Sequence, residues 1–168
     1  MTQMTATPGE AVRTTTAEPV AILTFELGDT RLGMLAASVR EVYPSATIAA
    51  LPRAPASIEG VLDVRGTMAP VFDLRSQLGL PPRAQGPDDH LIIAYAGERL
   101  VVVRVDRAID LIEVAAGDIE NGRQLDAGLR NIAGVARLPD GLVVIHDLTT
   151  FLSPAESAQL ATTLEART

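Results

Sequence analysis

Cysteine and lysine are both absent from this sequence of 168 residues. Without cysteine the chain has no disulfide, no thiolate zinc site and no cysteine nucleophile. Without lysine it has no P-loop lysine, no Schiff-base lysine and no Ser-x-x-Lys catalytic pair. All 14 basic residues are arginines. These absences exclude several large classes of enzyme.

Aromatic residues and positive charge are also scarce. Aromatics make up 3% of the chain, tryptophan is absent, and 14 basic against 21 acidic residues give a net charge of −7. Such a chain is repelled by phosphate, so we expect no nucleic-acid partner. No apolar run approaches the roughly 18 residues of a membrane span, and no signal peptide is evident. We therefore predict a cytoplasmic protein without direct membrane insertion.

Catalytic and metal-binding patterns are missing as well. The chain has only two histidines, His90 and His146. We interpret His90, beside Asp88 and Asp89, as the polar end of a loop before a strand, and His146 as a packed or half-exposed strand residue. No base, nucleophile and oxyanion set can be assembled. We predict no enzyme activity, no catalytic residue, no metal and no cofactor.

The chain from Val20 onward is rich in short apolar runs separated by turn signals, which favours an all-β barrel or sandwich. Residues 1–18 are predicted to be a flexible tail. Asp73 is predicted to cap a short helix over Leu74–Leu78. Ser153-Pro154-Ala155-Glu156 is a capping box that predicts a C-terminal helix over 153–168.

The sequence also repeats itself. Ile-x-Gly-Val and Asp-Leu recur 74 positions apart, at 58–61 and 132–135 and at 73–74 and 147–148. The repetition predicts two similar small barrels. Each half alone is marginal in size, so the two barrels are expected to share apolar surface. Residues 80–89, which contain three prolines, are predicted to be an exposed linker between the halves.

An ordered set of motifs resembles the CheW-like domain family. It consists of Phe25-Glu26-Leu27-Gly28, Val39-x-Glu41-Val42, Leu51-Pro52-x-Ala54-Pro55, and Ile58-x-Gly60-Val61 continuing through Arg65-Gly66 to Pro70-Val71-x-Asp73-Leu74-Arg75. Val105-Asp106 and the second Gly-Val and Asp-Leu pairs agree. The resemblance runs from about Val20 to Leu152, so residues 19–152 are expected to form the domain.

The resemblance implies two five-stranded SH3-like barrels with a shared core, and an adaptor without catalysis. Such adaptors couple chemoreceptors, the methyl-accepting proteins, to a CheA-type histidine kinase. The kinase regulatory domain would pack barrel to barrel, and the helical receptor tip would lie in an apolar groove near the barrel junction. Val39, Glu41 and Gly60 match kinase-binding positions. Arg65 matches an arginine implicated in receptor and kinase coupling.

Two positions depart from the family pattern. Asp63 replaces the usual asparagine of Asn-x-Arg-Gly, and Ala108 replaces a larger β-branched residue. Asp63 is a candidate partner for Arg65, which is otherwise free for a partner protein. Two alternatives remain: an adaptor of a non-chemotaxis kinase pathway, such as surface motility, and a small-ligand-binding barrel. The tail, domain and terminal helix together predict a standalone protein.

Overall fold

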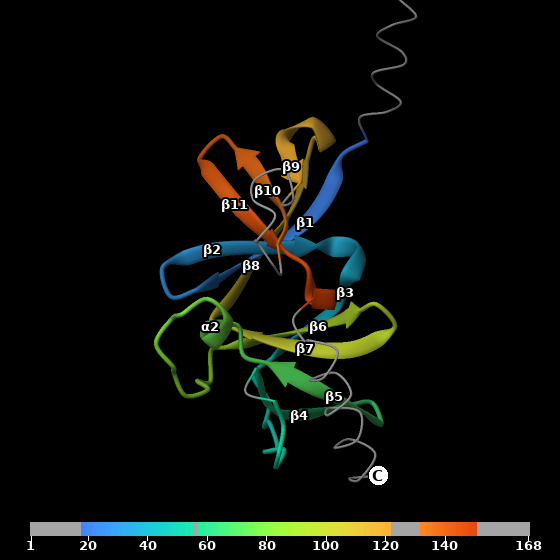
Figure 1. Ribbon diagram of the computed structural model, residues 1–168, viewed down its shortest axis with the longest axis vertical. Coiled ribbons are helices and arrows are strands. Elements are labelled where there is room, and N and C mark those ends of the chain that lie inside the picture. Colours follow the sequence, from blue (N-terminus) through green and yellow to red (C-terminus); the bar gives the residue numbers. More distant parts are fainter. Residues whose placement is uncertain (1–17, 56, 122–131, 151–168) are drawn as a thin grey trace, which may run out of the picture.

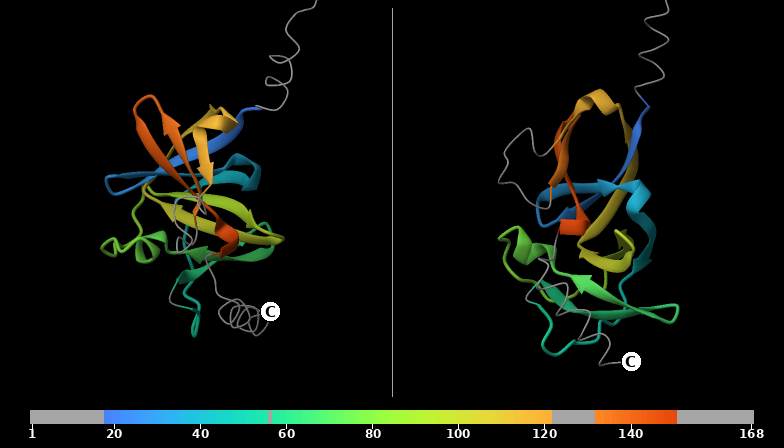
Figure 2. Two further views of the ribbon diagram at one scale, coloured as in Figure 1. Left: turned by 45° about the horizontal axis from the view of Figure 1, so that its top comes forward. Right: turned by 45° about the vertical axis from the view of Figure 1, so that its right-hand side comes forward.

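The computed structural model describes residues 18–55, 57–121 and 132–150 (Figure 1). Strands dominate this part of the chain, and they form two sheets. Figure 2 shows the two sheets as two stacked units, each curled into a barrel. The protein is therefore all-β with two SH3-like barrels, as predicted. The predicted N-terminal tail lies almost wholly outside the described residues, and the predicted C-terminal helix lies entirely outside them.

The six-stranded barrel combines strands from both ends of the domain. Its strand order is β8-β1-β2-β11-β10-β9. The strands are β1 (Val20–Leu27), β2 (Thr30–Leu35), β8 (Arg107–Val114), β9 (Ile119–Asn121), β10 (Ile132–Leu138) and β11 (Gly141–His146). Only the pair β2–β11 is parallel.

The five-stranded barrel uses the middle of the chain, in the order β3-β6-β7-β5-β4. The strands are β3 (Val39–Pro44), β4 (Ile58–Val64), β5 (Thr67–Phe72), β6 (His90–Ala96) and β7 (Arg99–Val105). Its one parallel pair is β5–β7. The single bridge between Ala49 and Val61 on β4 occupies the place that β9 takes beside β10.

The two barrels have the same strand order, but they do not correspond to the two halves of the sequence. The hairpin β1–β2 from the first half completes the barrel of β8–β11, and the hairpin β6–β7 from the second half completes the barrel of β3–β5. The chain therefore exchanges a hairpin between its halves. Exchange suits short repeats, because neither half is large enough to enclose a core alone.

The largest core cluster spans both barrels. It packs Phe25, Leu32 and Met34 of one barrel with Phe72 and Ile92 of the other, all at most 3% exposed. Burying side chains of this size is worth about 1.5 to 3 kcal/mol each, so the shared cluster fastens the barrels to each other. This agrees with the shared core that the resemblance implies.

The predicted Asp73 cap is confirmed, and Asp147 forms the matching cap in the second repeat. Asp73 accepts hydrogen bonds from the amides of Arg75 and Ser76 at the start of α2 (Leu74–Gln77). Asp147 accepts one from the amide of Thr149 at 3.0 Å, in the 3-10 turn η3 (Leu148–Thr150). Two further 3-10 turns, η1 (Ala36–Ser38) and η2 (Ala116–Asp118), join strands of the barrels.

Candidate functional site

The first candidate surface begins at the tip of the β4–β5 hairpin, where Arg65 and Gly66 form a two-residue turn. Their φ angles are 52° and 92°. Two positive φ angles match the tight hairpin turns that follow the twist of the strands. An arginine in this region is strained relative to glycine, by about 1 kcal/mol. The turn thus presents the Arg65 side chain, which is 63% exposed.

Asp63 holds the turn and not the arginine. Its Oδ1 accepts a hydrogen bond from the amide of Gly66 at 2.8 Å. The carboxylate thus stabilises the turn as an Asx-type acceptor. The expectation that Asp63 is a candidate partner of Arg65 is therefore wrong, because the partner comes from another strand.

Glu41 on β3 is the partner of Arg65. Arg65 Nη2 lies 3.0 Å from Glu41 Oε1, and the hydroxyl of Tyr43 lies 3.3 Å from the other carboxylate oxygen. Arg40 Nε is 3.7 Å from the same carboxylate. Strands β3 and β4 are the two edges of the five-stranded sheet. The ion pair therefore bridges the two edges of this barrel and brings two of the four predicted site residues together.

Gly60 is a point of close backbone approach. An ideal Cβ at Gly60 would lie 2.2 Å from the carbonyl oxygen of Ala49, a contact that cannot be accommodated without movement. The equivalent Cβ at Gly134 would lie 2.6 Å from the carbonyl oxygen of Glu120. Both glycines follow a register shift in their strands. Close packing, and not a positive φ, explains why glycine recurs here.

Val39 is the first residue of β3 and pairs with Ala94. Its side chain is partly buried against the shared core. A register shift separates it from Glu41, which pairs with Ile93, so Val39 and Glu41 lie on opposite faces of the strand. Val39 thus faces the shared core and not the Glu41 side chain. Gly60 lies on the opposite edge strand, β4.

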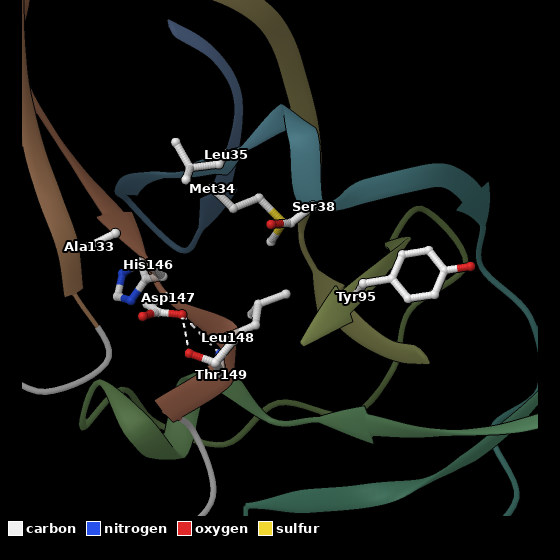
Figure 3. A pocket seen from close by; sticks show the side chains of 9 residues that line it. All are labelled: Met34, Leu35, Ser38, Tyr95, Ala133, His146, Asp147, Leu148 and Thr149. Atoms are coloured by element: carbon white, nitrogen blue, oxygen red, sulfur yellow. Dashed lines mark hydrogen bonds between the residues drawn. The ribbon is translucent and has the colours of Figure 1, made fainter. Parts of the chain in front are cut away.

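A second candidate surface is a pocket at the junction of the barrels (Figure 3). Its volume is about 140 Å³, and its lining residues are Met34, Leu35, Ser38, Tyr95, Ala133, His146, Asp147, Leu148 and Thr149. Among these, Met34 and Leu148 are almost fully buried, at 1% and 5% exposed, whereas Tyr95, 41% exposed, comes from the other barrel. His146 is packed, at 5% exposed, which is one of its two predicted placements, whereas no local pattern in the sequence predicts the lining of the pocket.

A cluster of ion pairs lies at the second crossover between the barrels, away from the pocket. No pattern in the sequence predicted it. Asp106 is the single residue between β7 and β8. Its carboxylate accepts hydrogen bonds from Nη2 of Arg75, Nη2 of Arg83 and the amide of Gly28, each at 2.6 Å. Arg83 also lies 2.6 Å from Asp89. Two arginines and two aspartates therefore meet at the point where the chain passes between the barrels.

The cluster continues into the five-stranded barrel through Arg104. Its guanidinium lies 2.9 Å from Glu59 and 2.9 Å from Asp89, which is only 3% exposed. Residues 81–84, 87 and 88 are exposed, as expected of the linker over 80–89, whereas Asp89 at its end is buried. This segment is fastened at Arg83 and Asp89, and we call it the strap. Three arginines, at 75, 83 and 104, balance three acids, at 59, 89 and 106, so the cluster is neutral.

The cluster shifts the pKa values of its carboxyl groups. Burial acts to raise the pKa of Asp106, but hydrogen bonds from Arg75, the Gly28 amide and Arg83 lower it to about 2. Burial likewise opposes the bonds to Asp89, whose pKa still falls below its usual range. At Glu59 burial prevails over Arg104 and raises the pKa. Asp106 is thus held charged by its partners.

Two kinds of site are not seen in the described part of the chain. Residues 18–55, 57–121 and 132–150 contain no group of three histidine, aspartate or glutamate side chains placed to hold a metal ion. Among the same residues, no helix is long and apolar enough to cross a bilayer. Nδ1 of His90 accepts a hydrogen bond from the amide of Ala108 at 2.8 Å.

The fold and these surfaces define a class of protein: a scaffold of two SH3-like barrels with contact surfaces on its strand edges and at its junction. The family model described as the CheW-like domain matches residues 21–156. The chain belongs to the CheW-like domain family, as its motifs predicted.

Individual relatives agree with this assignment. The chemotaxis protein CheW of Treponema pallidum is 25% identical over 150 residues, which cover 86% of this chain and 88% of that protein. Protein FrzA of Myxococcus xanthus is 34% identical over 95 residues, 56% of this chain and 59% of that protein. The scaffolding protein TtCheW of Thermoanaerobacter tengcongensis has a TM-score of 0.70 and 26% identity, covering 76% of this chain and 88% of that one.

Proposed function

We propose that this chain is a non-catalytic adaptor that couples chemoreceptors to a CheA-type histidine kinase in chemotaxis. The observation that carries the proposal is that the structure has two surfaces with no residue in common. One is the β3 and hairpin-tip surface with Glu41 and Arg65, and the other is the junction pocket. An adaptor needs two such surfaces, because both partners must be bound at once.

The kinase regulatory domain is assigned to the surface of Val39, Glu41, Gly60 and Arg65. Arg65 is displayed on a rigid turn and aligned by Glu41, so little side-chain freedom is lost when a partner binds it. A guanidinium in a fixed position suits carboxylates and carbonyl oxygens of a partner.

The receptor tip is assigned to the junction pocket. A helix that presents apolar side chains at i, i+3 and i+4 fits a hollow lined by Met34, Leu35 and Leu148. Tyr95 lies across the hollow from His146, with its exposed ring pointing away from the hollow (Figure 3), so a longer helix laid along the junction would meet it beyond the pocket. The pocket is small, and it therefore accepts one or two side chains of a helix that lies along the junction.

Titration calorimetry with the isolated kinase regulatory domain and with a receptor-tip fragment tests both assignments. Arg65→Ala should weaken kinase binding and leave receptor-tip binding unchanged, whereas Leu148→Ala should do the reverse. Asp140→Ala, at the corresponding hairpin of the other barrel, is the matched control and should bind both partners normally. Loss of both partners in either variant, with the fold intact, contradicts two separate surfaces.

An adaptor of another kinase pathway is a second candidate, because protein FrzA, one of the relatives, is not named as a chemotaxis protein. Reconstituted kinase assays separate the two. A chemotaxis adaptor activates its kinase only with chemoreceptors present. Equal coupling by a receptor outside chemotaxis supports the second candidate.

A further inference from the structure

The two barrels are joined by two crossovers that differ in kind. The chain passes from β2 to β3 through η1, which has no buried residue and no side-chain cap. It returns from β7 to β8 through one residue, Asp106, which is fixed by Arg75, Arg83 and the Gly28 amide. Of the two crossovers, η1 is therefore held by few interactions and Asp106 by several.

Asp106 fastens both barrels at one point. The Gly28 amide belongs to the β1–β2 turn of the six-stranded barrel, and the backbone amide of Asp106 donates to the carbonyl of Glu26 at 2.9 Å. Arg75 on α2 and Arg83 on the strap extend from the five-stranded barrel. In Figure 1 the β1–β2 turn lies beside α2. Charge-assisted hydrogen bonds of this kind are roughly twice as strong as neutral ones.

The junction pocket lies at the other end of the same strand. The turn at Gly28 precedes β2, and Met34 and Leu35 at the end of β2 line the pocket. Gly28 and Met34 are six positions apart, which is at most about 20 Å at roughly 3.3 Å per residue. Leu35, which precedes η1, and Ser38, the last residue of η1, also line the pocket, so this crossover forms part of the pocket wall. A small rotation about Asp106 therefore changes the width of the pocket at the far end.

We infer that Asp106 is a positioning residue for the junction pocket, because it sets the angle between the two barrels. It does not line the pocket. The shared apolar core keeps the barrels together but is non-directional, whereas the bonds at Asp106 have fixed directions. The inference rests on the proposed receptor role of the pocket, and it assigns the residue that keeps the pocket in its binding shape.

The test measures the angle without any partner. Because the chain has no cysteine, a label pair at Leu142→Cys and Glu98→Cys, one exposed position in each barrel, reports their separation by electron-spin resonance. Asp106→Asn keeps the size of the side chain but removes its charge. We expect a shifted or broadened distance distribution in Asp106→Asn and an unchanged one in Asp140→Asn, which loses the Arg31–Asp140 pair within one barrel.

Binding measurements then connect the angle to function. Asp106→Asn should weaken receptor-tip binding about tenfold, and kinase-domain binding at the Arg65 surface less than about twofold. Equal weakening of both partners indicates loss of folding and overturns a positioning role. An unchanged distance distribution also overturns it. If the wild-type protein does not bind a receptor tip, the proposed function fails, and the distance measurement still decides whether Asp106 sets the angle.

Discussion

The two barrels share one strand order and differ in their charge. Residues 39–105, which form the five-stranded barrel, carry seven arginines and seven acidic residues. The described residues of the other barrel, 18–38, 106–121 and 132–150, carry three arginines and ten acidic residues. The barrel fold therefore does not depend on the sign of its surface charge. The surface charges of the two barrels can therefore differ without a change of fold. The five-stranded barrel, with equal numbers of arginines and acidic residues, carries the Glu41–Arg65 ion pair that is proposed to contact the kinase.

The largest expected effect concerns the equivalent glycines. Gly60→Ala should lower the free energy of unfolding by about 2 to 4 kcal/mol, because the new methyl group meets the Ala49 carbonyl at 2.2 Å. Gly134→Ala should cost less, since the contact with Glu120 is 2.6 Å and the short β9 is an edge strand. Urea unfolding measures both. Equal costs contradict a clash that depends on the packing of each barrel.

The next effect is the pH dependence of the crossover at Asp106. Because the folded-state pKa of Asp106 is about 2 and an unperturbed aspartate has a pKa of about 3.9, its stabilisation is complete above pH 4 and is lost as the pH falls through 2. The partly exposed group should contribute about 1 to 2 kcal/mol.

Unfolding of the wild type and of Asp106→Asn should therefore differ at pH 5 and converge near pH 2. A constant difference across this range contradicts the assignment. Asp140→Asn, whose aspartate side chain is 70% exposed, should cost less at pH 5 than Asp106→Asn does, since water screens the pair.

The matched caps sharpen the comparison further. Asp73→Ala and Asp147→Ala should each lower the free energy of unfolding by about 1 kcal/mol, because each leaves helix-terminal amides without their acceptor. Thermal melting measures the loss. Partner binding at temperatures where the variants remain folded should stay close to that of the wild type. Unchanged melting in both variants contradicts the caps.

The smallest expected effect on stability is at Arg65. Arg65→Ala removes an exposed ion pair and should change the free energy of unfolding by less than about 1 kcal/mol. Coupling of receptor to kinase in a reconstituted assay should nevertheless fail. Asp140→Ala, at the matching hairpin tip, should leave both measurements unchanged. Normal coupling by Arg65→Ala identifies Arg65 as a solvated turn residue.

Local features were predictable because neighbouring residues determine them. The Asp73 and Asp147 caps need only a carboxylate and the amides that follow it. The Arg65-Gly66 turn lies between two apolar runs and was recognisable as a hairpin. The partner of Arg65 was not predictable, because Glu41 is 24 residues away and meets it only when the edges of the barrel approach each other.

The sequence by itself determined that the chain is all-β, that it consists of two related units, and which glycines and aspartates recur in them. Apolar periodicity and turn-forming residues act over a few neighbouring positions, so they can be recognised directly in the sequence. Only the tertiary structure decided which hairpin enters which barrel, where the junction pocket forms, and how Asp106 gathers its partners. Those outcomes depend on contacts between residues far apart in the chain, 78 positions for Gly28 and Asp106 and 109 for Arg31 and Asp140, and the order of residues does not specify them locally.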